Sequence, residues 1–344
     1  MKRKSQTILV AVALAACCRP LSSNAQQDNG FAPQLHGTLR AKYEYQTDNN
    51  IQRFEVRNAR ISVTGKVVDK VAYKAEIDLC DEGVIKMLDA YTRVTPWKRL
   101  ELTLGQMRVP FTIDAHRSPH QQYFANRSFI AKQVGNVRDV GFMAGYTFQA
   151  AFPVVLSGGV FNGSGLTAQK DYWSKGVNFS AKAQLMLPKG FNVTLSTQKI
   201  SPNGITVMMY DGGAYYHAHG WHVEGEYLYK HYAHGMFDPV HAVDAFVSYD
   251  IPLKNRRLMV RKVSPLVRYD YMSDHSDGTL NEDATAMKTT DYRRSRLTAG
   301  MTLSLGLPFV SDIRINYENY FYRHGAMPKI SEDDKVVIEL MTRF

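Results

Sequence analysis

Side-chain polarity alternates in about sixteen strand-length segments between Gln34 and Phe344. Successive side chains of a β-strand point to opposite faces, so each of these segments presents one apolar face and one polar face. The connectors between segments also alternate in length. Every second connector is short, as at residues 96–100, 187–191 and 218–221, whereas the others include the long polar stretches 108–138 and 273–292.

Sorting of connector length by parity is typical of a membrane barrel, which has tight turns at one end and extended loops at the other. We therefore predict an all-β fold, a transmembrane antiparallel β-barrel of about 16 strands with short periplasmic turns and long extracellular loops. Residues 251–264 are the one long connector that breaks the parity pattern. No segment beyond the N-terminal region approaches the roughly 18 consecutive apolar residues that a spanning helix needs, so insertion into a membrane must use strands.

The two ends of the chain fit an exported barrel. Basic residues at positions 2–4, an apolar run at 8–16 and the small-residue site Ser23-Asn24-Ala25 predict a signal peptide at residues 1–25, leaving 26–344 as the barrel. A lipobox-like sequence, Leu14-Ala15-Ala16-Cys17, leaves lipidation of Cys17 open as an alternative. The last segment alternates and ends in Phe344, which resembles the signal read by the barrel-assembly machinery. The predicted location is the outer membrane of a Gram-negative bacterium, with many spans.

Composition agrees with a barrel. A hydrophobic content of 44% with a mean hydropathy of −0.30 is too polar for a helical membrane protein, but it fits strands of which only every second residue meets lipid. The formal charge is +10, and it falls to +6 when the four bases of residues 1–25 are removed. Such an excess can line the lumen and favour anions, or lie at the rims beside anionic lipid headgroups. Only Cys80 would remain in the processed chain, so an intrachain disulfide is excluded.

Charged residues fall on the face opposite the apolar one. A basic residue on the lipid face near the bilayer midplane costs roughly 2–4 kcal/mol, so we place the charges in the lumen. The bases predicted to face the lumen are Arg40, Lys42, Arg60, Lys74, Lys182 and Arg268, and the acids are Glu44, Glu76, Asp78 and Asp270. About sixteen strands enclose a lumen too wide for side chains to fill, so the barrel should conduct.

The connector at residues 108–138 is the candidate constriction. It carries Arg108, Arg117, Arg127, Lys132 and Arg138 against Asp114 and Asp139. In general porins a loop at this place folds into the lumen, and the similar position here suggests a narrow passage lined by bases. A guanidinium group stays charged and can donate two parallel hydrogen bonds to the oxygens of one phosphate or carboxylate. A loop that lies on the rim with solvated charges is the alternative.

Several stretches resemble the phosphate-selective porin O and P family. The most specific is residues 89–130, with Asp-Ala-Tyr at its start and Gly-Gln-x-basic-x-Pro-Phe at 105–111, and residues 54–67, 138–148 and 265–274 add further matches. The resemblance implies a sixteen-stranded barrel, commonly a trimer, that passes anions by diffusion through an arginine-rich constriction. Arg108 and Arg127 fall where the family pattern has bases, whereas Arg117, Lys132 and Arg138 are placed by loop position. The inward acids interrupt a continuous basic ladder, so phosphate specificity does not follow from the resemblance.

We therefore predict an outer-membrane porin for passive diffusion of small hydrophilic solutes, with a preference for anions and phosphate as the candidate solute. The expected partners are outer-membrane lipid and lipopolysaccharide, small anions such as phosphate, two further copies in a homotrimer and the barrel-assembly machinery, with no nucleic acid. An alternative is a surface-exposed barrel that binds a ligand or partner through its extracellular loops without significant conduction.

No catalytic residue, cofactor or metal is predicted. The chain has no nucleophile motif and no compact Ser-His constellation on one strand, so an enzyme is not expected. His217, His219 and His222 could form a metal site if two of them converged across a turn, but short turns carry polar residues routinely. The acids around Cys80 do not have the spacing of a calcium loop.

Overall fold

The computed structural model describes residues 31–344, apart from residues 82, 134–136, 150, 167–168, 171, 174, 256–258, 307–309, 324–325 and 327. The expected signal peptide and the lipobox-like cysteine lie outside the described residues. The barrel unit begins at Pro33 and ends at Phe344. Among the described residues, no helix has both the length and the apolar character needed to cross a bilayer.

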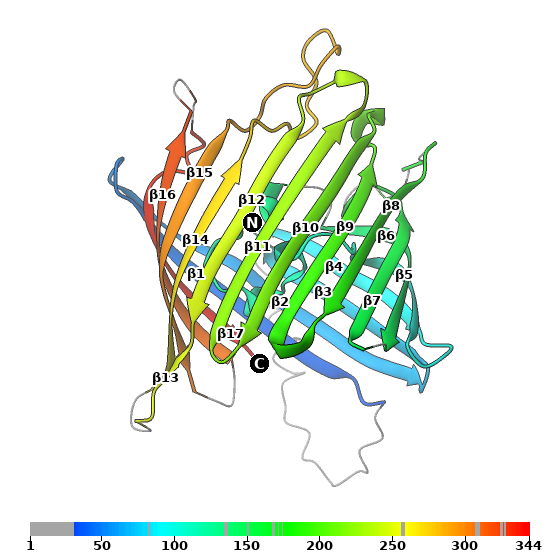
Figure 1. Ribbon diagram of the computed structural model, residues 1–344, viewed down its shortest axis with the longest axis horizontal. Coiled ribbons are helices and arrows are strands. Elements are labelled where there is room, and N and C mark those ends of the chain that lie inside the picture. The colour runs from blue at the N-terminus through cyan, green and yellow to red at the C-terminus, as the bar shows by residue number, and fades with distance from the viewer. Residues whose placement is uncertain are drawn as a thin grey trace, which may run out of the picture. The chain divides into compact units, whose positions relative to one another are not determined.

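A single antiparallel sheet closes on itself, because β1 pairs with both β2 and β17 (Figure 1). Its strands are β1 (Gln34–Gln46), β2 (Ile51–Val68), β3 (Val71–Asp81), β4 (Val84–Val94), β5 (Leu100–Arg108), β6 (Arg138–Gln149), β7 (Pro153–Phe161), β8 (Asn178–Met186), β9 (Phe191–Ile200), β10 (Val207–Ala218), β11 (Trp221–Tyr232), β12 (Val240–Tyr249), β13 (Ile251–Pro252), β14 (Val260–Met272), β15 (Arg294–Leu305), β16 (Val310–Tyr322) and β17 (Lys335–Arg343). Both β12 and the two-residue β13 pair with β14, so they form one barrel strand. The prediction of a closed barrel of about 16 strands is confirmed.

The connectors define two ends of the barrel. The turn end carries short connectors such as residues 69–70 and 219–220, and the loop end carries 162–177, 273–293 and 323–334 (Figure 1). The expectation of a long connector at 251–264 is wrong, because β13 pairs with β14 and the connector is shortened to 253–259. The difference in length is not uniform, since the first connector of the loop end has only residues 47–50.

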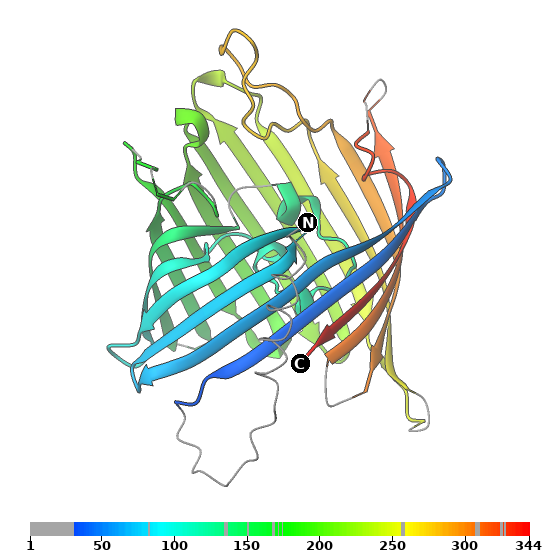
Figure 2. The same ribbon diagram turned by 180° about the vertical axis from the view of Figure 1, so that it is seen from behind.

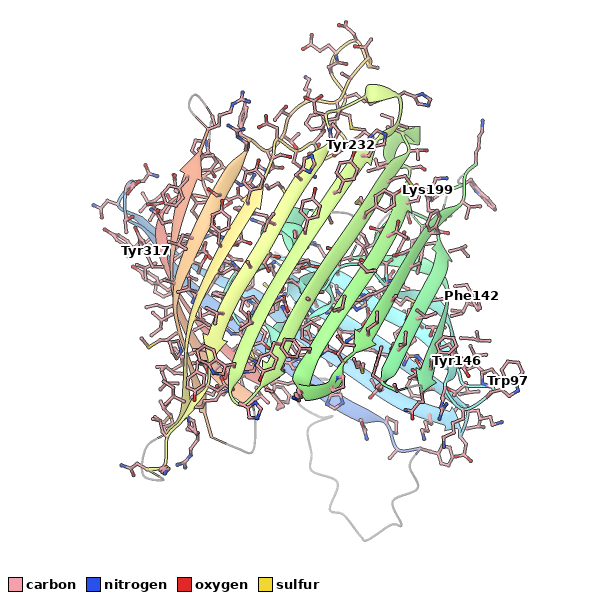
Figure 3. The ribbon with its side chains drawn as sticks, viewed as in Figure 1. Trp97, Phe142, Tyr146, Lys199, Tyr232 and Tyr317 are labelled. Carbon is pink, nitrogen blue, oxygen red and sulfur yellow. The ribbon has the colours of Figure 1, made fainter. Side chains whose placement is uncertain are left out.

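The outward face of the barrel is apolar and carries aromatic residues near both ends. Outward side chains that are more than one-third exposed include Leu39, Leu195, Val247 and Ile338. Figure 3 shows Phe142, Tyr146 and Tyr317 pointing away from the barrel, with Trp97 at the turn end. On a membrane barrel, an apolar outer band contacts the hydrocarbon core and aromatic residues lie at the two membrane–water interfaces.

Closure of the barrel uses the last residue of the chain. The Phe344 N–H donates to the Gly37 carbonyl at 3.0 Å, and the Gly37 N–H donates to the Phe344 carbonyl at 2.8 Å. The Phe344 ring lies over Gly37, where a Cβ atom would come within 2.3 Å of the ring. Glycine at position 37 is therefore required for this packing, because any side chain would displace the terminal ring.

The connector between β5 and β6, residues 109–137, lies inside the barrel, and we call it the inserted loop (Figures 1 and 2). It contains the short helices η1 (Asp114–His116), η2 (Pro119–Gln121) and α2 (Phe129–Gln133). The other short helices, η3 (Pro188–Gly190), η4 (Pro202–Gly204) and η5 (Ala233–Gly235), belong to connectors at the ends.

An apolar core lies between the inserted loop and the barrel wall. Phe129 and Ile130 of α2 are 1% and 0% exposed, and they belong to one cluster with the inward side chains of Met209, Leu228 and Met272. The expectation of a polar inward face is therefore wrong for these positions on β10, β11 and β14. The loop supplies apolar side chains of its own, so apolar inward residues are buried there without contact with lipid.

Candidate functional site

The inserted loop is fixed to the wall by buried polar contacts as well as by its apolar core. Arg117 forms a bidentate pair with Glu224 of β11, with Nη1 at 2.8 Å from Oε1. The N–H groups of Ile113 and Asp114 both donate to the Glu226 carboxylate. Asp114 in turn accepts hydrogen bonds from the Ser128 N–H at 3.0 Å and the Ser128 hydroxyl at 2.8 Å, which joins the two arms of the loop.

The loop covers one side of the lumen and leaves the other side open. Inward residues of β14 to β17 and β1 are almost all buried, and Arg314 and Glu339 have no exposed side-chain surface. On the neighbouring strands β2, β3 and β4, Arg60, Lys74 and Arg93 keep 11, 23 and 32% of their side-chain surface exposed. We call the lumenal faces of β2, β3 and β4 the open wall, since water reaches several of their charged side chains.

The structure places every lumen-facing base of the sequence analysis inside the barrel, and most of them are paired with acids. The pairs are Arg40 Nε–Glu339 Oε2 at 2.9 Å, Lys42–Glu44 at 2.9 Å, Arg60–Asp78 at 2.8 Å, Lys74–Asp89 at 2.6 Å and Arg268–Asp270 at 2.8 Å. Two further bases are also paired: Arg138 with Asp89 at 2.7 Å and Lys132 with Glu332 at 3.4 Å. Paired charges of this kind largely cancel, so counting bases overstates the positive charge of the lumen.

Arg108 and Arg127 differ from these residues. In the part of the chain that the structure describes, neither guanidinium has a carboxylate within salt-bridge distance. Arg108 Nη1 donates to the carbonyl oxygens of Ala115 at 2.9 Å and Arg117 at 3.0 Å, and Arg127 Nη2 donates to the same Arg117 oxygen at 3.3 Å. The two cations therefore converge on one carbonyl. Each guanidinium has five N–H donors, so donors remain beyond these bonds. Lys182 also lacks a carboxylate partner in the described residues, but its ammonium donates to the Thr112 carbonyl beneath the loop.

Electrostatics within the loop separate its charged groups into two kinds. Burial, together with the charges of Arg60, Arg40 and Arg138, lowers the pKa of Arg127 to about 9, although Asp114 opposes this shift. Burial alone would lower the pKa of Arg117, but the adjacent Glu224 carboxylate raises it. Both arginines remain charged near neutral pH. Arg117 is held by an anionic partner, whereas Arg127 lies among cations.

Two histidines of the loop are neutral at ordinary pH. Burial and neighbouring cations, chiefly Lys182, lower the pKa of His116 to about 3. Burial and Arg343 lower the pKa of His120 to about 4. These rings therefore add no charge to the lumen at pH 7.

Cavities lie at both ends of the inserted loop. A cavity of about 570 Å³ at the turn end is lined by residues that include Arg117, Tyr123, Lys182 and Asp250. A second cavity of about 380 Å³ at the loop end is lined by residues that include Arg40, Arg127, Arg296 and Lys335. Most bases around the second cavity have acid partners. Arg127 is the exception among the described residues, since it has no carboxylate within salt-bridge distance.

The histidines His217 and His222, which flank the turn between β10 and β11, are not arranged as a vacant metal site. The rings of His217 and His222 have centroids 4.0 Å apart across the β10–β11 ladder. His222 already uses both ring nitrogens, one with the Tyr123 hydroxyl at 3.1 Å and the other with Asp250 at 3.1 Å. This arrangement connects the inserted loop to the turn end.

Several acids that pair with the bases were not predicted from the sequence, among them Glu339 and Asp89. Glu224 and Glu226 are inward residues of β11, and the alternation of residues 221–232 could have identified them. The same alternation places Lys230 in the lumen, which was also missed. Glu339 could have been placed on the inward face of β17 in the same way, but its pairing with Arg40 depends on barrel closure.

A family model for phosphate-selective porin O and P matches residues 34–206, about half of the 344 residues. The chain belongs to the phosphate-selective porin O and P family. This porin is therefore an outer-membrane protein, and its family and fold are those of a channel. A search of curated proteins found no match.

Solved porin structures share the fold of this porin at low sequence identity. An anion-selective porin from Comamonas acidovorans superposes with a TM-score of 0.61 at 11% identity, covering 91% of this chain and 98% of that one. The outer membrane channel DcaP of Acinetobacter baumannii gives 0.58 at 12% identity, covering 93% and 98%. The trimer form of OmpT, an outer membrane protein of Vibrio cholerae, gives 0.58 at 11% identity, covering 92% and 99%.

Proposed function

We propose that this porin passes small hydrophilic solutes by passive diffusion and prefers anions, with phosphate as the first candidate. The observation that carries the proposal is the pair Arg108 and Arg127, whose guanidinium groups converge without a carboxylate partner in the described residues. Bases in a narrow passage concentrate anions and partly replace their hydration shells, and binding of moderate strength lets the anions leave.

The remaining candidate residues have supporting roles in this proposal. Arg60, Lys74 and Arg138 shape the potential of the open wall together with their acids, and Arg117 positions the inserted loop. Arg40, Lys42, Lys132, Lys182 and Arg268 hold the loop and the loop-end cavity in place. The inserted loop, within residues 108–138, is the constriction.

The proposal is tested by reversal potentials across a planar bilayer that contains the purified protein, under a potassium chloride gradient with phosphate then added. An anion-selective current that phosphate blocks at low concentration supports the full proposal. Stable channels with cation selectivity would retain the porin and reject the anion mechanism. A folded barrel that forms no channel would favour a surface barrel that binds a ligand or partner through its loops.

We further propose that the protein is a homotrimer in lipid and lipopolysaccharide, that its signal peptide is removed after Ala25, and that Phe344 is read by the barrel-assembly machinery. The trimer is supported by the trimer form of OmpT, which shares the fold. Native mass spectrometry of protein extracted from outer membranes would test both the copy number and the mass expected for cleavage after Ala25. Deletion of Phe344 should reduce the amount of folded protein in the outer membrane.

A further inference from the structure

A third cavity, of about 390 Å³, lies at the loop end, apart from Arg108 and Arg127. Its wall combines residues of β9, β10 and β11 with Lys132 of the inserted loop and residues of the connectors 201–206, 273–293 and 323–334. The volume lies within the range of small-molecule sites in proteins. Lys230 of β11 reaches this cavity with only 6% of its surface exposed.

Lys230 is a buried cation without an acid partner in the described part of the chain. Its ammonium donates to His275 Nε2 at 3.2 Å and lies 5.0 Å from the centroid of the Tyr232 ring. Burial lowers the pKa of His275, so the ring is neutral and cannot offset the charge. A buried charge that has no counter-ion is costly, and an anion that enters the cavity would remove that cost.

The acids around this cavity contact groups other than Lys230, and Asp291 and Glu332 have cationic partners. Asp291 contacts Lys329 at 2.5 Å and Arg294 at 3.5 Å, and Glu332 contacts Arg294 at 2.7 Å. Asp277 Oδ1 accepts hydrogen bonds from the N–H and hydroxyl of Thr279 at 2.9 and 2.7 Å. Their negative charges would also oppose a second negative charge on a ligand. Of the three lysines that line the cavity, Lys132 contacts Glu332 at 3.4 Å and Lys329 contacts Asp291, so Lys230 is the one without a carboxylate partner among the described residues.

One side of the wall is apolar, and the connector above the cavity is firmly held. Ile200, Pro202 and Val207 line the cavity together with the Tyr232 ring. His275 is fixed by reciprocal backbone hydrogen bonds with Asp291 at 2.8 and 3.0 Å, so the connector above the cavity is not a loose strand. An apolar side next to the unpaired Lys230, with three acids elsewhere in the wall, suits a ligand that has one negative charge and an apolar body better than it suits a phosphate dianion.

We propose that this cavity binds a small organic monocarboxylate, with its carboxylate on Lys230 and its apolar part against Ile200, Pro202 and Val207. The site would hold the solute at the extracellular mouth before the constriction. Its place on the transport route rests on the proposed function, whereas binding itself does not require conduction.

The test is calorimetric titration of the purified full-length barrel in detergent with benzoate, and with benzamide as the uncharged molecule of the same shape. Benzoate should bind and benzamide should not. Lys230→Met should weaken benzoate binding about tenfold or more, because a charge-assisted hydrogen bond is lost, and Lys230→Arg should retain binding. Lys199→Met is the matched control, since Lys199 lies on the outer face of β9 (Figure 3).

A second variant guards against misfolding of Lys230→Met. Pro202→Glu on the connector keeps Lys230 and supplies an internal carboxylate, so it should also abolish benzoate binding. Equal binding of benzoate and benzamide, or unchanged benzoate binding in both variants, would overturn the proposal. Benzoate binding by a barrel that shows no anion selectivity in bilayers would reject the proposed function and keep this site. An anion-selective channel without benzoate binding would do the reverse.

Discussion

Replacing Arg108 and Arg127 together by glutamine should sharply reduce anion selectivity while the barrel stays folded. The two guanidiniums lie within 3.0 and 3.3 Å of one carbonyl oxygen, so an anion beside one of them is within reach of the other. A unit charge at about 4 Å contributes roughly 1 kcal/mol even at the dielectric constant of water, and more in a partly buried site. Folding should not suffer, because the substitutions remove two cations that repel each other.

The size of the expected change follows from these energies. Loss of about 1 kcal/mol per charge lowers anion occupancy about fivefold for each arginine. The same loss of positive charge raises cation occupancy, so the anion-to-cation permeability ratio should fall about tenfold or more. Salt at 0.1 M screens over about 10 Å, which is longer than a contact, so the effect should survive in ordinary recording buffers. The assay is the reversal potential in a potassium chloride gradient, which should move toward zero or change sign.

The control changes the same net charge outside the lumen. Lys98, in an exposed turn, and Lys199, on the outer face, are replaced together by glutamine. The control should retain the reversal potential of the unchanged protein. If the arginine variant also retained it, with normal folding, the unpaired arginines would not set selectivity and the reasoning from pairing would fail.

Glu224→Gln should leave the buried Arg117 with only the longer contact to Asp114, at 3.4 Å; breaking a buried pair costs about 3–5 kcal/mol, so the inserted loop should loosen and single-channel currents should become larger or noisier. Phe129→Ala should cost about 3–5 kcal/mol through the cavity it leaves, which a lower unfolding temperature would show without a change in selectivity. Burial lowers the pKa of His116 to about 3 and the pKa of His120 to about 4, from 6.5. The folded loop therefore has its full stability above pH 6.5 and loses stability as pH falls toward 3, because the unfolded chain takes up these protons first. Limited proteolysis of the loop should increase at pH 4 relative to pH 7, and a loop equally resistant at both would contradict the assignment.

Strand faces could be predicted from the sequence because alternation is a local property. Arg40, Lys42 and Lys74 face the lumen as expected, since each lies between outward apolar neighbours and a one-residue shift would expose every charge of the strand to lipid. The location of the candidate constriction between β5 and β6 was also local information. Its role in selecting solutes stays a prediction.

The packing of the inserted loop could not be predicted, because its partners lie far away in the sequence. Arg40 and Glu339 are 299 positions apart, and they meet only because β1 closes on β17. Leu228 and Met272 contradict the polar lumenal pattern, and they do so because α2 covers them with Phe129 and Ile130. A rule that treats all inward positions as wet fails wherever a loop fills the lumen.

Desolvation influences which charges are paired. Beneath the loop there is little room for water, so a bare cation would pay a large desolvation cost, and Arg314 accordingly pairs with Glu339 where both are fully buried. Arg108 and Arg127 are half-buried and donate to backbone carbonyl oxygens, and they remain without carboxylates among the described residues. Selectivity should therefore follow the few cations that water reaches and no acid neutralises. The net charge of +6 expected after processing is a property of the whole chain, and it does not determine the electrostatic potential along the passage.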